Sequence, residues 1–261
     1  MTATTASRTQ VTSSVPRDTY TVFARAMRMS LRNPAWLVIS LMQPILYIVL
    51  FGPLLKPLSG QLGSGNAYQL FVPGILVQLG IFGALFVGFG LIAEYRAGVI
   101  ESQRVTPASR TALLLGRVLL NAVQLLVQAV VLVLLGFAFG LRASVGGIAF
   151  GIVLTVLLGA ACACASNAIG LLTKSEDVLA PLLNSISLPV LLLSGILLPI
   201  TQPQWLKGLA DVVPTKHVVD AIRTVFTGTF DSTVWWGTFW AVLVFALAGW
   251  WGTRVFRREN A

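Results

Sequence analysis

The chain has 261 residues, of which 56% are hydrophobic and only 10% are charged. Soluble domains carry about 25% charged residues, so this composition excludes a soluble globular protein and favours a polytopic helical membrane protein. The net charge is +9, but the basic residues are scattered between long apolar runs. That pattern indicates a positively charged cytoplasmic side rather than nucleic-acid binding.

The N-terminal region divides into two parts. Residues 1–19 are rich in Ser and Thr and lack an apolar core, so we expect a disordered cytoplasmic tail and no cleavable signal peptide. Residues 20–33 have helical periodicity, with Arg25, Arg28 and Arg32 on one face and apolar side chains on the other. This pattern predicts an amphipathic helix in the inner membrane interface. A plain basic anchor that sets the topology is the alternative.

Six apolar stretches approach or exceed the length of about 20 residues that a membrane-spanning helix needs. The predicted spans cover residues 36–55, 70–93, 113–141, 145–173, 178–200 and 234–253. Together with the interfacial helix they predict an all-α transmembrane domain over residues 20–258. Pro44 lies inside the first span, where we expect it to kink the helix.

The distribution of basic residues predicts the orientation, because cytoplasmic loops are enriched in Lys and Arg. With six spans, 13 of the 18 basic residues fall on the side that holds both termini. We therefore expect both termini in the cytoplasm and the chain in a plasma or inner membrane. The excess of 14 Arg over 4 Lys suggests a GC-rich bacterial genome.

Residues 94–110 connect the second and third spans and carry charges of both signs. Glu101 and Arg104 are three residues apart and can pair on a short helix, while Gly98 permits a sharp turn or a close approach. Thr106 and Pro107 are typical of the N-cap and first position of the following helix. These features predict a short cytoplasmic helix. A bland charged connector is the alternative.

Residues 201–231 are too polar to span the membrane, but they contain two stretches with apolar residues at helical spacing. We expect two short amphipathic helices at the outer surface, between the fifth and sixth spans. His217 is the only histidine, and we interpret it as an interfacial or solvated residue rather than a metal ligand.

Several amides lie inside the predicted spans: Gln43, Gln78, Asn121, Gln124, Gln128, Asn167 and Asn184. Such groups either face a cavity or hydrogen-bond to neighbouring helices, and the sequence leaves both possibilities open. Asn121, Gln124 and Gln128 share one helix face, so we take these three and Asn184 as candidates for a translocation path. The sequence predicts no catalytic or metal-binding residues, and Cys162 and Cys164 point in different directions on one helix, which predicts no disulfide.

Four features occur in order along the chain. They are a basic amphipathic helix ending in Arg32-Asn33-Pro34; the run Glu94-x-Arg96-x-Gly98-x-x-Glu101 with Thr106-Pro107 and Arg110; Gly116-Arg117; and residues 214–223, PTKHVVDAIR. With these features in this order and with six predicted spans, the chain resembles the ATP-binding-cassette type 2 (ABC-2) exporter permeases over about residues 20–258. The resemblance is strongest to the multidrug permeases of the daunorubicin-resistance kind. Relatives often have Arg-Gly followed by Thr and Glu, whereas this chain has Ala97-Gly98-Val99-Ile100-Glu101, a mild departure.

The resemblance implies a transport subunit that exports a hydrophobic or amphipathic molecule, drug-like or lipid-like, from the cytoplasm or inner leaflet. It implies a coupling helix seated in a groove of a separate ATPase subunit and a re-entrant hairpin over residues 201–231. The expected assembly has two ATPase chains and two permease chains, identical or related, among membrane lipids and without nucleic acid. ATP and Mg would be bound by the partner, and no cofactor by this chain. The expected coupling residues are Glu94, Arg96, Gly98, Glu101 and Arg104.

Three other functions are the alternatives. Export of a polysaccharide or glycolipid would use the same arrangement of six spans. A secondary transporter usually places ionisable groups in mid-membrane, whereas the charges here lie at span ends or in loops. A membrane scaffold would not need a segment that resembles a coupling helix. The sequence also contains no G-x-x-x-x-G-K-[ST] motif, so a phosphate-loop nucleotide site is not expected in this chain.

Overall fold

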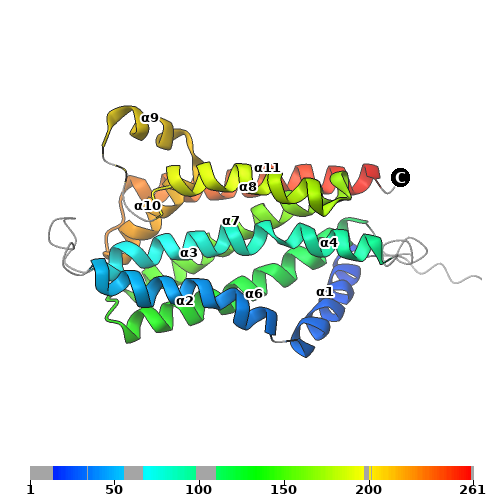
Figure 1. Ribbon diagram of the computed structural model, residues 1–261, viewed down its shortest axis with the longest axis horizontal. Coiled ribbons are helices and arrows are strands. Elements are labelled where there is room, and N and C mark those ends of the chain that lie inside the picture. The colour runs from blue at the N-terminus through cyan, green and yellow to red at the C-terminus, as the bar shows by residue number, and fades with distance from the viewer. Residues whose placement is uncertain are drawn as a thin grey trace, which may run out of the picture.

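The computed structural model describes residues 14–33, 35–55, 67–97, 110–196, 200 and 202–259, whose regular secondary structure is entirely α-helical. Most helices run side by side along the long axis, while α1 lies across one end and α9 and α10 lie at the other (Figure 1). The helices are α1 Val15–Arg32, α2 Ala35–Leu55, α3 Ala67–Leu85, α4 Val87–Arg96, α6 Arg110–Ala138, α7 Val145–Thr173, α8 Glu176–Leu193, α9 Gln204–Val212, α10 Pro214–Phe226 and α11 Ser232–Glu259.

Within the described residues, five helical segments are long and apolar enough to cross a membrane. They are Tyr68–Arg96, Thr111–Ala138, Val145–Thr173, Glu176–Leu193 and Ser232–Arg258. The protein is therefore an all-helical, multi-pass membrane protein, as the composition predicted. α2 covers the first predicted span and contains a shorter apolar helix, Leu41–Leu54.

Three differences from the sequence prediction have a local structural cause. α1 begins at Val15 rather than Tyr20, because Pro16 suits the first helical turn and Asp18 is favourable there; residues 15–19 are thus helical rather than part of a disordered tail. α8 ends at Leu193 rather than residue 200, where Gly195 adopts a positive φ of 66° that stops the helix.

The third difference is a break in the second predicted span, where α3 ends at Leu85 and α4 starts after a turn at Phe86. A side chain of α7 fills the gap in hydrogen bonding: the Ser166 hydroxyl donates to the Leu85 carbonyl oxygen and accepts from the Gly88 backbone N–H at 3.0 Å. Backbone groups inside a membrane need such internal partners. The break is therefore a supported feature of the span.

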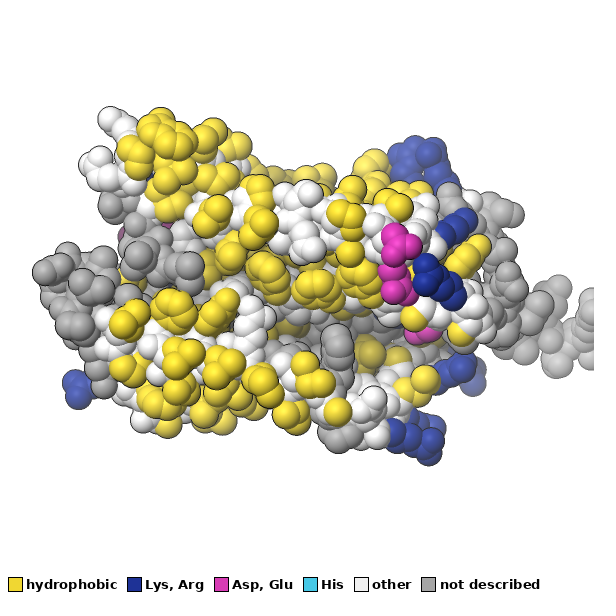
Figure 2. All heavy atoms as spheres, viewed as in Figure 1, with side chains coloured by type: hydrophobic (Ala, Val, Ile, Leu, Met, Phe, Trp, Pro, Cys, Tyr) yellow, Lys and Arg dark blue, Asp and Glu magenta, His cyan; other side chains and the backbone are white. Residues whose placement is uncertain are grey.

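α7 forms the centre of the bundle and contacts α3, α4, α6, α10 and α11. Its buried face is rich in Gly and Ala, which lets neighbouring backbones approach closely. At Gly88 of α4, a Cβ atom would lie 2.5 Å from the Ser166 carbonyl oxygen, so only glycine fits this contact. The outer surface, by contrast, carries many exposed apolar side chains along α2 and α11, and apolar side chains cover much of the face seen in Figure 2, as lipid contact requires.

The two ends of the bundle differ in charge. We call one the basic end: it holds α1, the C-termini of α4 and α11 and the start of α6, and charged side chains gather on the visible face there (Figure 2). Its described basic residues include Arg25, Arg28, Arg32, Arg96, Arg117, Lys174, Arg254, Arg257 and Arg258. The opposite end holds α9 and α10, the two short helices expected in residues 201–231, and we call it the hairpin end.

A buried arginine fixes α10 to the hairpin end. Arg223 donates to the carbonyl oxygens of Leu70 at 3.0 Å, Gly195 at 2.7 Å and Ile196 at 3.1 Å. Burial lowers the pKa of Arg223 to about 10, opposed by Asp220 at 3.7 Å. One guanidinium thus joins α10 to the start of α3 and to the residues that follow α8.

Candidate translocation cavity

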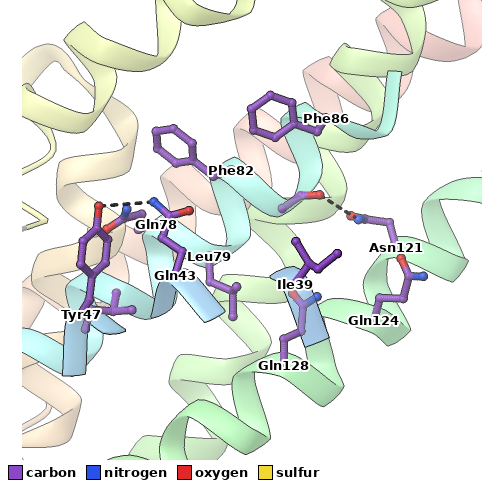
Figure 3. Close-up of a pocket in the computed structure, with 12 residues that line it drawn as sticks. Ile39, Gln43, Tyr47, Gln78, Leu79, Phe82, Phe86, Asn121, Gln124 and Gln128 are labelled. Atoms are coloured by element: carbon purple, nitrogen blue, oxygen red, sulfur yellow. Dashed lines mark hydrogen bonds between the residues drawn. The ribbon is translucent and has the colours of Figure 1, made fainter. Parts of the chain in front are cut away.

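A cavity of about 250 Å³ lies between α2, α3 and α6. We call it the amide cavity because five of its lining residues are amides: Gln43, Gln78, Asn121, Gln124 and Gln128. Its other walls are Ile39, Tyr47, Ile75, Leu79, Phe82, Gly83 and Phe86. Figure 3 shows Tyr47, Gln43 and Gln78 towards one side of the cavity and Asn121 and Gln124 towards the other.

Hydrogen bonds fix several of these amides. Gln43 Nε2 donates to the Tyr47 hydroxyl at 3.3 Å, one turn further along α2. Asn121 Nδ2 donates to the Gly83 carbonyl oxygen at 3.4 Å, which links α6 to α3 (Figure 3). Gln124 Nε2 donates to the Ser30 hydroxyl at 2.9 Å. The interfacial helix α1 is therefore joined directly to a residue that lines the cavity.

A second cavity, of about 530 Å³, lies next to the amide cavity on the side of the basic end. The two cavities share Gly83, Phe86, Asn121 and Gln124, so the turn between α3 and α4 lies where they meet. The second cavity also reaches Glu94, Arg117 and Glu176. The linings of these two adjacent cavities together extend from charged groups at the basic end to amides within the bundle.

Two ion pairs and a cation–π contact connect helices at the basic end. Glu94 of α4 forms a salt bridge with Arg117 of α6, whose side chain is only 13% exposed. Arg96 pairs with Glu176 of α8 at 3.6 Å, and both of these side chains are about half exposed. Lys174 lies 5.5 Å from the centre of the Tyr95 ring. The end of α4 is thereby attached to α6, to α8 and to the segment between α7 and α8.

The predicted path residues fall into two groups. Asn121, Gln124 and Gln128 line the amide cavity, whereas Asn184 lies exposed on α8 and does not line it. Gln43 and Gln78 are not among the path residues that the sequence predicts, although both line the cavity. Their amide chemistry was the only available signal, since their convergence depends on how α2 and α3 pack.

The predicted coupling and interfacial residues are placed only in part. Glu94 and Arg96 occupy the last turn of α4, while Gly98, Glu101 and Arg104 lie outside the described residues. Arg25, Arg28 and Arg32 are exposed on α1 and line a shallow depression of about 450 Å³. α1 packs against the start of α6 at Gly116.

The remaining candidate groups have structural roles. Within the described residues no three His, Cys, Asp or Glu side chains gather to hold a metal ion, and Cys162 and Cys164 are free cysteines of α7. His217 stacks on Trp240 with ring centroids 5.9 Å apart and contacts the Asp211 carbonyl oxygen at 2.9 Å. Asn167 donates to Ala163 within α7.

The helical bundle, its apolar outer surface and the amide cavity together define a multi-pass membrane transport protein. The described residues contain no nucleotide-binding fold. Residues 17–227 match the ABC-2 type transporter family. Because this match covers most of the chain, the protein belongs to that family and is a permease subunit. The family domain is a transport component that contains no ATPase domain, and membership implies ATP use by a partner ATP-binding subunit.

Several curated proteins are similar to this chain at low identity. The daunorubicin resistance ABC transporter permease protein DrrB1 of Streptomyces coeruleorubidus is 24% identical over 214 residues, which cover 81% of this chain and 75% of that protein. A putative transport permease, ycf38 of Porphyra purpurea, is 28% identical over 205 residues, covering 76% and 70%. The probable doxorubicin resistance permease DrrC of Mycobacterium tuberculosis is 26% identical over 182 residues, covering 69% and 66%.

Proposed function

We propose that this chain exports a hydrophobic or amphipathic molecule, drug-like or lipid-like, from the cytoplasm or inner leaflet. The observation that carries this proposal is the pair of adjacent cavities, whose linings together extend from charged groups at the basic end to the amides within the bundle. Apolar walls with a few fixed polar groups are typical of sites for small molecules. The relatives named for daunorubicin and doxorubicin resistance support a drug-like substrate.

The proposed topology has six spans, with α2 as the first, and places the basic end in the cytoplasm. The enrichment of Lys and Arg at that end supports it, because cytoplasmic ends of membrane proteins carry these residues. Both termini then lie in the cytoplasm of a plasma or inner membrane, with residues 20–258 as the transmembrane domain. α9 and α10 form a re-entrant hairpin at the outer side.

The proposed assembly has two ATPase chains with bound ATP and Mg and two permease chains, identical or related. Residues 94–104 couple the permease to the ATPase. Glu94 and Arg96 are held in pairs with Arg117 and Glu176, so their part is to transmit movement from this segment to α6 and α8. Glu101 is the proposed polar contact with the partner.

The test is reconstitution of the chain with its ATPase partner in lipid vesicles. We expect an amphipathic drug such as daunorubicin to stimulate ATP hydrolysis and to accumulate on the side opposite the ATPase. Stimulation by a glycolipid alone would assign the substrate to the polysaccharide or glycolipid group. Transport driven by a proton or sodium gradient in the absence of ATP would refute the proposal.

A further inference from the structure

The amide cavity contains two polar atoms that indicate which chemistry it recognises. Gln78 and Asn121 are only 5% and 4% exposed. The side-chain carbonyl oxygen of each, Gln78 Oε1 and Asn121 Oδ1, has no hydrogen-bond partner within the described part of the chain. Buried polar atoms are nearly always hydrogen-bonded, so each of these two needs a partner that the described residues do not supply.

The orientation of the Asn121 amide follows from its surroundings. Its nitrogen lies 3.4 Å from the Gly83 carbonyl oxygen, which can only accept a hydrogen bond. The nitrogen must therefore face Gly83, and the oxygen Oδ1 must face another direction. Because Asn121 and Gln78 lie on different helices and line the same cavity, a single ligand can approach both side chains.

Both unpartnered atoms are hydrogen-bond acceptors, so a ligand group that pairs with them must be a hydrogen-bond donor. Hydroxyl and amino groups fulfil this requirement. A carboxylate, an ether or a fully ionised phosphate has only acceptors and would leave both amide oxygens unsatisfied. Charge on the ligand is therefore less important at this point than the presence of N–H or O–H groups.

The rest of the cavity favours an apolar body. Ile75, Leu79 and Phe82 of α3 provide apolar walls, and Phe86 lies at the junction with the second cavity. Ile39 of α2 lines the cavity yet remains 61% exposed on the apolar outer surface. The cavity is thus bordered by a helix that faces lipid, which suits a molecule that partitions into the membrane.

We propose that the amide cavity binds amphipathic molecules whose apolar body carries a hydroxyl or amino donor, and that it selects them against analogues whose donors are blocked. This names the substrate class for the proposed exporter and rests on that function. In this proposal the side-chain oxygens of Gln78 and Asn121 accept hydrogen bonds from the donor group of the ligand.

The test compares pyrene probes that share one body: a 1,2-diol, a primary amine and the dimethyl ether of the diol. Binding to the full chain in lipid nanodiscs is measured by fluorescence anisotropy. We expect the diol or the amine to bind about fivefold or more tightly than the ether, as one or two hydrogen bonds predict. A preference for the diol alone or for the amine alone supports the proposal and identifies the donor.

Two variants and a matched control locate the effect. In Asn121→Leu and in Gln78→Met, we expect the preference over the ether to fall to within about twofold. Asn184→Leu removes an exposed amide outside the cavity and should keep the preference of the unmodified chain. Equal binding of all three probes to the unmodified chain, or an unchanged preference in both cavity variants, overturns the proposal.

Because binding is measured without an ATPase, the two hypotheses fail separately. If ATP-driven export is not observed but the donor preference is, the proposed export function is refuted and the proposed binding site is retained. Loss of the donor preference with intact ATP-driven export would remove this proposal and leave the function.

Discussion

Buried and exposed ion pairs at the basic end contribute differently to the free energy of unfolding. Arg117 is nearly enclosed and depends on Glu94, whereas Arg96 and Glu176 are both about half exposed. Exposed pairs contribute about 0–1 kcal/mol, while leaving a buried charged donor without its acceptor costs more. The pair of Glu94 and Arg117 should therefore maintain the fold of the permease itself.

We predict that Glu94→Ala destabilises the permease by about 1–3 kcal/mol, because the buried Arg117 side chain loses its ion pair with Glu94. Thermal unfolding in detergent measures this change. Glu176→Ala is the matched control, since it breaks the exposed pair with Arg96 and should cost about 1 kcal/mol or less. Equal unfolding temperatures for the two variants would contradict the assignment.

The close contact between α1 and α6 depends on Gly116, because glycine has no side chain. A Cβ atom at Gly116 would lie 2.7 Å from Val22 Cγ1 and 3.2 Å from the Phe23 backbone nitrogen. The same interface includes the hydrogen bond from Gln124 to Ser30. The position of the interfacial helix is therefore connected to the lining of the amide cavity.

Gly116→Ala is expected to push α1 away from α6 and to raise deuterium uptake across Val15–Arg32 several-fold. Gly249→Ala on α11 is the control, because a Cβ atom there meets nothing within 4 Å and alanine favours a helix by about 1 kcal/mol. If α1 exchanges equally in both variants, the close contact is not what holds it.

At the hairpin end, α9 is attached to α10 by the ion pair between Asp211 and Lys216. The hydrogen bond from Lys216 holds the pKa of the Asp211 carboxyl below its ordinary value of 3.8, although the carboxyl itself is largely exposed. A carboxyl whose pKa is lowered by folding stabilises the folded state above its ordinary pKa. The contribution is lost as the pH falls through the lowered value.

We therefore predict that Asp211→Asn increases proteolysis or deuterium uptake of Gln204–Val212 at pH 7, and that the difference from the unmodified chain disappears in strong acid. Asp231→Asn, which replaces an exposed carboxylate beyond α10, is the control. A pH-independent difference would show that the ion pair is not the cause.

For the molecule as a whole, orientation and assembly follow from charge and from the family. With the basic end in the cytoplasm, a cysteine placed at Ser64 should react with a membrane-impermeant maleimide from outside. A cysteine placed at Ser102 should react only after the membrane is opened. The single cysteines are introduced into a chain lacking Cys162 and Cys164. Reversed accessibility would contradict the whole topology.

Coupling gives the sharpest test at this scale. We predict that Glu101→Ala leaves the permease folded and inserted but weakens co-purification of the ATPase or uncouples hydrolysis from export, since truncating one partner of a buried interface pair costs about 2–5 kcal/mol. Native mass spectrometry of the unmodified complex should show two permease and two ATPase chains. Full association and full export by Glu101→Ala would reduce residues 94–104 to an ordinary connector.

The sequence alone determined the membrane class, the approximate spans and the asymmetry of charge, because hydrophobic length and the placement of Lys and Arg are local properties of the chain. Residues 145–173, for example, were predicted with the bounds that α7 has. The short helices α9 and α10 were also predictable, since their apolar residues recur at helical spacing.

Only the tertiary structure decided which polar residues meet. The rotation and packing of α2 and α3 place Gln43 and Gln78 in the same cavity as Asn121, while the packing of α8 leaves Asn184 exposed. Likewise, the break at Phe86 exists because Ser166, about 80 residues away in the chain, supplies the hydrogen bonds that the helix lacks there. Such contacts depend on how helices distant in sequence lie against one another, and helical periodicity gives each helix a face without naming the neighbour that the face will meet.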